Sequence, residues 1–321
     1  MDLAGLRHDG RRPGEMRELR VKLGVSRSHD GSAYLELGLT RVLAHVVGPH
    51  EPDSRTRGAG NASGLHGPAG GCYINVDFMH APFAGVERRK RRANDRQSVE
   101  LSLAVRSSLA GAIVTEAYPQ MQIDVYIILI QDDGGRLPAC LNAATMAVLD
   151  AGVSMKDVLV TCSAGLLMGV GANTAVPVVD MSHREQGAGG AYLPVAILPR
   201  TEEVVLAQMD SKLPLMALEP VLATAISGCH QVHSVLREAL LHRCDFMLSA
   251  RQLSFEEHMS ENNEEGRDDS DGTTKVGAEV KATEVQTSTM LAAPQRQNPT
   301  RGGWLVDSES EDGGGSDEAE G

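Results

Sequence analysis

The segment 131–145, QDDGGRLPACLNAAT, has the composition of a strand that ends and turns into a helix. Gly134 and Gly135 follow a strongly apolar run, and a proline falls near the first turn of the expected helix. The free N–H groups of such a helix start converge on one point and suit a phosphate or another anion. Leu137, however, stands where an anion site favours a hydroxyl or a cation, and Arg136 is the nearest cation.

Two further groups of residues have types that could bind a ligand. A dense basic run precedes an expected helix and consists of Arg88, Arg89, Lys90, Arg91 and Arg92, followed by Arg96. A short basic run of this kind is by itself typical of a solvated loop or a nuclear-localisation patch. His230 and His233 lie one helical turn apart, but a metal site normally needs three or four ligands, so no metal site is predicted.

The spacing of apolar residues predicts the elements that must position these groups. Alternating or continuous apolar runs predict strands, and apolar residues at three- and four-residue spacing predict helices. Strands are expected at about 19–25, 33–37, 42–47, 73–78, 123–130, 158–168, 175–180, 193–198 and 204–209, and helices at 97–117, 139–151 and 215–248. This order predicts an α+β domain of mixed sheets with packed helices over residues 1–255. The Gly-, Ser- and Asn-rich stretch 54–71 is expected to be a mobile loop.

The net charge of -13 belongs almost entirely to the C-terminal part of the chain. Of the 43 acidic and 30 basic residues, 17 and 5 lie in 256–321. This stretch is poor in core-forming residues and is predicted to be an acidic disordered tail. Trp304, the single tryptophan, lies in it and is either a chance apolar residue or part of a short linear motif. The nearly neutral body remains compatible with a basic binding surface.

The cysteines and the apolar runs indicate the cellular compartment. The five cysteines form no CxxC pair and sit mostly in apolar runs, which is typical of reduced, buried thiols. No apolar run approaches the length of a membrane span, and MDLAGLRHDGRR lacks a signal-peptide core. We therefore expect a protein of the cytosol or the nucleus, without contact to a membrane.

Several segments in register resemble one known family. They are DGRRPGEMRELRVKLGV, DGSAYLELGLTRVLAHVVGPHEP, ERRKRRANDRQSVEL, the segment 131–145 and MKDVLVTCSAGL. Together they resemble the RNase PH family, and among its members the exosome core subunit of the type that is catalytic in archaea. The resemblance covers about residues 6–240 and implies the RNase PH-like fold, which is ribosomal protein S5 domain 2-like and assembles into six-membered rings. Active members release nucleotides from RNA 3′ ends with inorganic phosphate, and no further cofactor is expected.

Four positions depart from the pattern that the resemblance implies for active members. Their phosphate loop reads Gly-Thr-Arg, whereas here Gly135 is followed by Arg136 and Leu137. Gly134, Gly135 and Arg136 are therefore interpreted as a vestigial phosphate site. Gln186 and Tyr192 occupy the two positions of the catalytic aspartates, and neither is a carboxylate at neutral pH.

The fourth departure is at the end of the basic run. Gln97 replaces a cation that is expected to touch phosphate or RNA, while Arg96 is retained. The same resemblance places the loop that carries Arg88 to Arg92 along the RNA channel, so these residues and Arg96 are predicted to contact single-stranded RNA. Asp180 and Glu185 still match the frame of the acidic segment.

Three functions are compatible with these residues. The preferred one is a non-catalytic RNase PH-like subunit of the RNA exosome core ring that shapes the RNA channel during rRNA maturation and mRNA turnover. Its expected partners are other RNase PH-like ring subunits, cap subunits with RNA-binding domains and an attached hydrolytic nuclease. The alternatives are an active phosphate-dependent 3′-5′ exoribonuclease that uses Arg136, and a single-protein ring that processes tRNA ends.

Overall fold

A computed structural model describes residues 6–52, 71–85, 88, 95–168, 175–209 and 211–265, with only the backbone of 253–265. The chain divides into two units, Met1–Asn263 and Glu264–Gly321. The predicted loop 54–71 lies outside the described residues except for Gly71. Residues 266–321 of the predicted tail also lie outside them.

The first sheet has five strands and carries most of the core. Its order is β1 (Leu19–Leu23), β2 (Gly31–Leu37), β3 (Thr40–His50), β5 (Gln122–Gln131) and β4 (Tyr73–His80). Only β4 and β5 run parallel, and the other neighbours are antiparallel. Every second side chain of β3 is buried, from Thr40 to Val46, because alternate residues of a strand face the same side.

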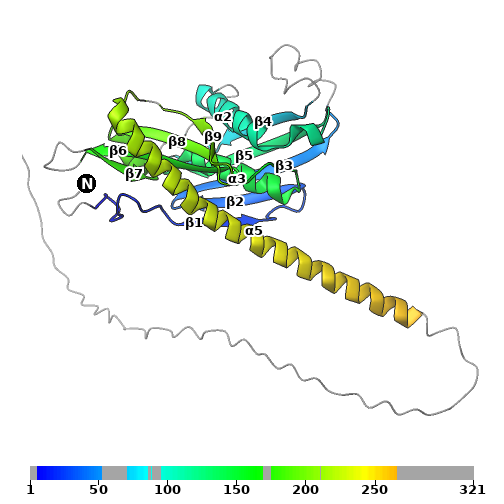
Figure 1. The fold of residues 1–321 in the computed structure, drawn as a ribbon. Coiled ribbons are helices and arrows are strands. Elements are labelled where there is room, and N and C mark those ends of the chain that lie inside the picture. Colours follow the sequence, from blue (N-terminus) through cyan, green and yellow to red (C-terminus); the bar gives the residue numbers. More distant parts are fainter. Residues whose placement is uncertain are drawn as a thin grey trace, which may run out of the picture. The chain divides into compact units, whose positions relative to one another are not determined.

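The second sheet has four strands and is antiparallel throughout. Its order is β7 (Ala175–Val179), β6 (Val160–Met168), β8 (Ala191–Leu198) and β9 (Glu203–Ala207). The predicted combination of mixed sheets with packed helices is therefore the one observed (Figure 1).

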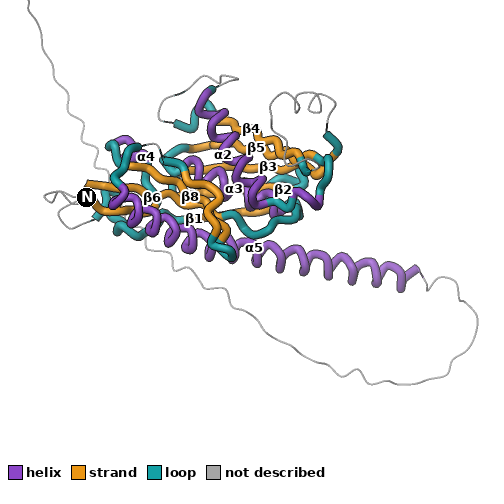
Figure 2. The backbone as a smooth tube through the Cα atoms, turned by 45° about the horizontal axis from the view of Figure 1, so that its top comes forward, coloured by secondary structure: helices purple, strands orange, loops and turns teal. Residues whose placement is uncertain are grey.

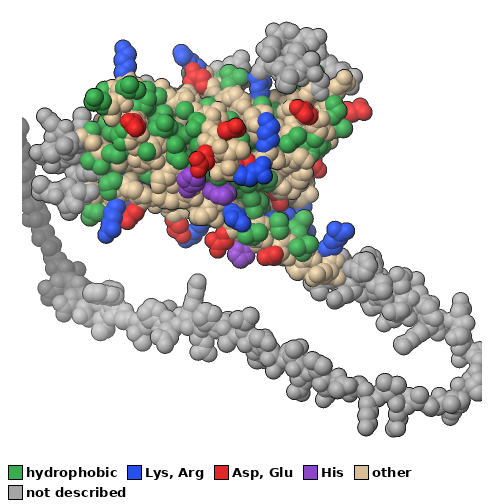
Figure 3. Space-filling model, in the orientation of Figure 1, with side chains coloured by type: hydrophobic (Ala, Val, Ile, Leu, Met, Phe, Trp, Pro, Cys, Tyr) green, Lys and Arg blue, Asp and Glu red, His purple; other side chains and the backbone are tan. Residues whose placement is uncertain are grey.

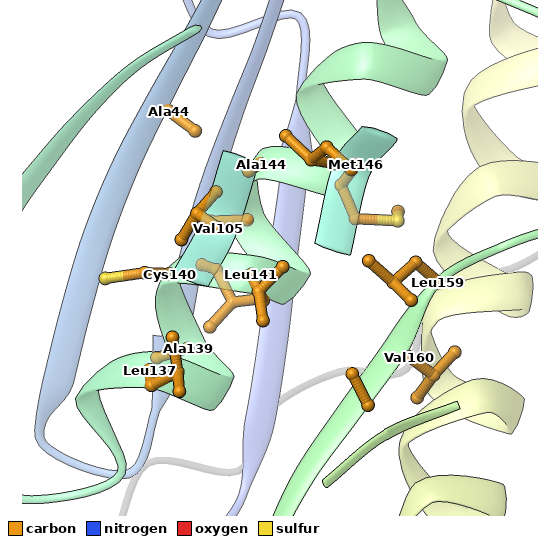
Figure 4. Packing of buried hydrophobic residues seen from close by; sticks show 14 of the residues in the cluster. Ala44, Val105, Leu137, Ala139, Cys140, Leu141, Ala144, Met146, Leu159 and Val160 are labelled. Carbon is orange, nitrogen blue, oxygen red and sulfur yellow. The ribbon is translucent and has the colours of Figure 1, made fainter. Parts of the chain in front are cut away.

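Helix α3 (Arg136–Asp150) lies between the two sheets and is buried on all sides (Figures 1 and 2). It contacts β2, β3 and β5 of the first sheet and β6 and β8 of the second. Its small residues, among them Ala139, Cys140 and Ala144, pack against both sheets (Figure 4). Gly31 lies against the Ala147 carbonyl so closely that a Cβ there would clash. The Ala-rich sequence thus permits a helix at the centre of the domain.

The other helices lie around these layers, and several of the helix bounds differ from prediction. Helix α2 (Arg96–Ala112) ends before the predicted residue 117, because Ile113 turns extended and pairs with Met155; a 3₁₀ turn follows at Thr115–Ala117. Helix α3 begins at Arg136 and not at 139. The short α4 (His183–Gly187) was not predicted.

Helix α5 (Leu215–Glu265) is the longest element and extends well past the predicted end at 248. Residues 256–265, which were assigned to a disordered tail, are its last turns. Their polar residues lack the periodic apolar stripe on which the prediction of the helix depended. Among the described residues, no helix is long and apolar enough to cross a membrane.

Candidate active site

One cavity of about 330 Å³ collects the positions that the sequence singled out. Gln97 comes from α2, Arg136 and Leu137 from the start of α3, Gln186 from α4 and Tyr192 from β8. The remaining lining residues are Glu100, Leu101, Ala104, Gly190, Pro194, Gln208 and Ser211. The positions that the sequence singled out, from Gln97 to Tyr192, therefore share one site, as the family resemblance implies.

The loop before α3 has the geometry of an anion-binding helix start. Gly134 and Gly135 have φ angles of 85° and 65°, in the left-handed region that glycine adopts without strain. A Cβ at Gly134 would lie 2.6 Å from the backbone nitrogen of His183, so this glycine also lets α4 approach the loop. The His183 N–H donates to the Asp133 carbonyl at 3.0 Å, which joins the two segments.

The side chains at this helix start are poor ligands for phosphate. Leu137 is only 5% exposed and contributes an apolar wall to the cavity. The Arg136 guanidinium lies at the cavity, but its Nε is 3.5 Å from Oδ2 of Asp132. Since a neighbouring carboxylate already balances its charge, Arg136 offers an incoming anion less than an unpaired arginine would.

The two positions expected to carry aspartates are neutral. Burial raises the pKa of the Tyr192 phenol above its ordinary value, and the charge of Arg136 does not offset this. The Nε2 atom of Gln186 is buried and has no hydrogen-bond partner among the described residues. Glu100 is the one carboxylate among the described residues that line the cavity, and it pairs with Arg96 at 2.7 Å. The cavity therefore lacks a buried group able to exchange a proton near neutral pH.

A buried framework of ion pairs holds the acidic segment in place. Arg7 is 1% exposed and Glu185 6%, and the guanidinium contacts both carboxylate oxygens. Arg17 forms a second two-bond pair with Asp180, at 2.7 Å and 2.8 Å. Arg11 adds a third contact to Asp180 at 3.5 Å. These pairs fix the chain just before α4, at Asp180, and within α4, at Glu185, next to Gln186.

The predicted RNA-binding residues are described only in part. Arg88 is exposed, and Arg89, Lys90, Arg91 and Arg92 lie outside the described residues. Arg96 is 91% exposed and lies one helical turn before Glu100 at the cavity. Among the described residues, no group of three His, Cys, Asp or Glu side chains could hold a metal ion.

Comparison with known proteins identifies the family. Residues 15–154 match the RNase PH family, described as "3′ exoribonuclease family, domain 1". The exosome complex component RRP41 of Homo sapiens is 42% identical over 233 residues, which are 72% of this chain and 89% of the relative. The chain belongs to the RNase PH family. The exosome complex component Rrp41 of Methanopyrus kandleri is 36% identical over 236 residues, 74% of this chain and 92% of the relative.

Solved structures agree with this RNase PH assignment. Rice Rrp46 superposes with a TM-score of 0.60 at 18% identity, over 72% of this chain and 98% of that one. A chain of the Archaeoglobus fulgidus exosome with RNA bound to the active site superposes with a TM-score of 0.58 at 22% identity, over 72% and 92%. Both the predicted family and the predicted RNase PH-like fold class are confirmed.

Sequence reasoning identified the cavity positions of this RNase PH protein but missed its ionic framework. Arg7 and Arg17 both lie within or next to the N-terminal segment that carries the family resemblance. Nothing in a single sequence indicates that Arg7 pairs with a residue 178 positions away. A capping signal was present for α4, because Ser182 and Glu185 have the spacing of a capping box and form one.

Proposed function

We propose that this RNase PH protein is a non-catalytic ring subunit of an RNA exosome, in which it helps to form the channel for single-stranded RNA. One observation carries the proposal: the cavity at the start of α3 is lined by Leu137, Gln186 and Tyr192, which supply neither a cation for phosphate nor a carboxylate. Losing a general acid–base group typically lowers a rate by about 10²–10⁴-fold. The similarity to RRP41 proteins, which are exosome complex components, supports the assembly.

The proposed partners follow from the same relationship. Other RNase PH-like subunits would complete the ring, cap subunits with RNA-binding domains would cover one end, and a hydrolytic nuclease would supply cleavage. The basic segment from Arg88 to Arg92 would contact the RNA backbone, with an affinity that falls steeply as salt rises.

An active phosphate-dependent 3′-5′ exoribonuclease is the second candidate, and Arg136 is the observation in its favour. This arginine lines the cavity beside the α3 start, where the first N–H groups have no partner within the helix. A phosphate bound there would have to attract the guanidinium away from Asp132. The RNA 3′ end would also have to react without a carboxylate at position 186 or 192.

Decay of a 3′-tailed RNA by the protein together with its ring partner, with and without inorganic phosphate, separates the two functions. The non-catalytic function predicts no release of nucleoside diphosphates under either condition. Phosphate-dependent release that is lost in Arg136→Ala would establish the exoribonuclease instead.

RNA binding tests the channel role in the same preparation. Replacing the basic residues from Arg88 to Arg92 by Ser should weaken binding and flatten its salt dependence. Arg237→Ser, on the exposed surface of α5, is the matched control and should leave binding unchanged. Equal binding by both variants would contradict the channel role.

A further inference from the structure

The free edge of β1 and the adjoining face of α5 enclose an open groove that the proposed function does not use. In the described part of the chain, β1 pairs only with β2, so its other edge has no neighbouring strand. The groove has a volume of about 690 Å³ and is lined by five consecutive residues, Arg20 to Gly24, and by residues of α5. We name it the β1–α5 groove.

The backbone of β1 presents hydrogen-bonding groups to this groove. The N–H of Gly24 donates to the Ser32 carbonyl, and the N–H of Gly38 donates to the Glu18 carbonyl. Since hydrogen-bonded pairs alternate along an antiparallel ladder, the even-numbered residues of β1 bond to β2. The N–H and C=O groups of Val21 and Leu23 therefore point to the free edge.

The helix side of the groove carries apolar residues beside polar ones, and the helix is held in position. Val235, Ala239, His242 and Phe246 follow each other at helical spacing and share one face of α5. Phe246 is 63% exposed although it is aromatic. The helix is fixed there because Arg243 Nε bonds Oδ1 of Asp150 at 3.0 Å. On the face drawn in Figure 3, hydrophobic, cationic and acidic side chains are all present on the described surface.

The charges around the groove favour an acidic occupant. Arg20 and Lys22 are exposed on the outer face of β1, whereas Arg243 on the helix side is already paired with Asp150. Glu238 is the one carboxylate among the described lining residues. Arg20 contacts Glu18 in an exposed ion pair, which contributes little.

We propose that the β1–α5 groove binds an extended segment of a partner protein that adds to β1 as a strand. In an added strand, alternate side chains point to opposite faces. One set would lie beside Arg20 and Lys22 and should be acidic. The other set would lie beside Val21, Val235 and Phe246 and should be apolar. The occupant is therefore a peptide that alternates carboxylates with aliphatic residues, and its binding does not depend on whether the cavity at α3 is active.

Binding of a short synthetic peptide that alternates Glu with Val, to the full-length protein, tests this proposal. The double variant Arg20→Glu/Lys22→Glu should weaken binding roughly tenfold or more, because two attractive contacts become repulsive. Lys22→Glu alone should weaken it less. Arg237→Glu, on another face of the same helix, is the matched control and should bind as the unchanged protein does.

Two further measurements distinguish strand addition from simple charge attraction. The peptide should slow hydrogen exchange at the Val21 and Leu23 amides, and a version with methylated backbone nitrogens should not bind. Equal binding of the methylated peptide, or no binding of the original one, would overturn the proposal. So would amides of Val21 and Leu23 that are already protected in the assembled complex, since a neighbouring subunit would then cover the edge.

Discussion

Replacing Arg7 by Ala should strongly destabilise the domain, although Arg7 lies near the start of the chain and outside the cavity. Its guanidinium contacts both oxygens of Glu185 and donates to the carbonyls of Val179 and Asp180. Removing it leaves a carboxylate that is 6% exposed without its counter-charge. Breaking a buried pair in this way typically costs about 3–5 kcal/mol of unfolding free energy. For a domain of this size, that corresponds to a fall in melting temperature of roughly 6–20 °C.

Thermal and urea unfolding of the full-length protein would measure this effect. The matched control is Arg12→Ala in the same segment, because Arg12 is 79% exposed and its Nε lies 3.8 Å from the nearest Glu15 oxygen. An exposed pair contributes at most about 1 kcal/mol. A double variant, Arg7→Met/Glu185→Leu, should lose less stability than the two single changes together, since no unpaired charge remains. A loss below about 1 kcal/mol in Arg7→Ala would refute the reasoning.

The pH dependence of the same variant gives an independent check. Burial alone would raise the pKa of Glu185, but the bonds from Arg7 and the Ser182 N–H, with the charge of Arg7, hold the pKa below the ordinary value of 4.5. The stabilisation is therefore complete above pH 4.5 and is lost as the pH falls through the lower folded-state pKa. The difference between Arg7→Ala and the unchanged protein should be largest near neutral pH and should shrink in acid.

Three further outcomes follow from the packing. Gly165→Ala should lower the unfolding free energy, measured in urea, by about 3 kcal/mol or more, because the new Cβ would clash with buried Met181. The control Gly187→Ala places its Cβ in open space and should change the unfolding free energy by less than about 0.5 kcal/mol. Alkylation of the native protein followed by mass spectrometry should modify the exposed Cys244 first, since the other four cysteines are buried and burial raises the pKa of Cys72 to about 11. Burial, and to a smaller extent the stacked ring of His29, lower the pKa of His45 below 6.5. The unfolding free energy should therefore fall as the pH drops from about 7 to 5, and His45→Gln should reduce this pH dependence in unfolding titrations.

The strands and α3 were predictable because their residues follow a simple burial pattern. Strand β3 alternates buried and exposed positions, and α3 consists of small apolar residues that suit a central helix. The predicted ends of helices were wrong where contacts with distant residues decide where a helix stops. Helix α2 stops at Ala112 because Ile113 pairs with Met155, a residue far along the chain. The last turns of α5 were missed because a polar stretch carries no apolar periodicity.

The residues that line the candidate site were predictable from the sequence, but the buried ion pair that holds the segment of Gln186 was not. The family resemblance named Gln97, Leu137, Gln186 and Tyr192, and the cavity contains all four. The segment that carries Gln186 is held by the buried bonding of Arg7, which has no local sequence signal because it joins residues 178 positions apart. An ion pair between distant residues depends on the whole fold, whereas a cap or an apolar stripe depends on a few neighbours.

The framework and the cavity lining have separate physical roles, so the pocket keeps its shape with neutral residues at positions 186 and 192. Asp180 and Glu185 are each tied to arginines of the N-terminal segment, so their charges are balanced within the protein. Gln186 and Tyr192 carry no charge, and their burial needs no counter-ion. A carboxylate at position 186 or 192 would need a nearby positive charge to offset its desolvation. That charge would have to come from a bound cation or from Arg136, which already pairs with Asp132. Neutral residues at both positions are therefore compatible with the fold, as the proposed non-catalytic role requires.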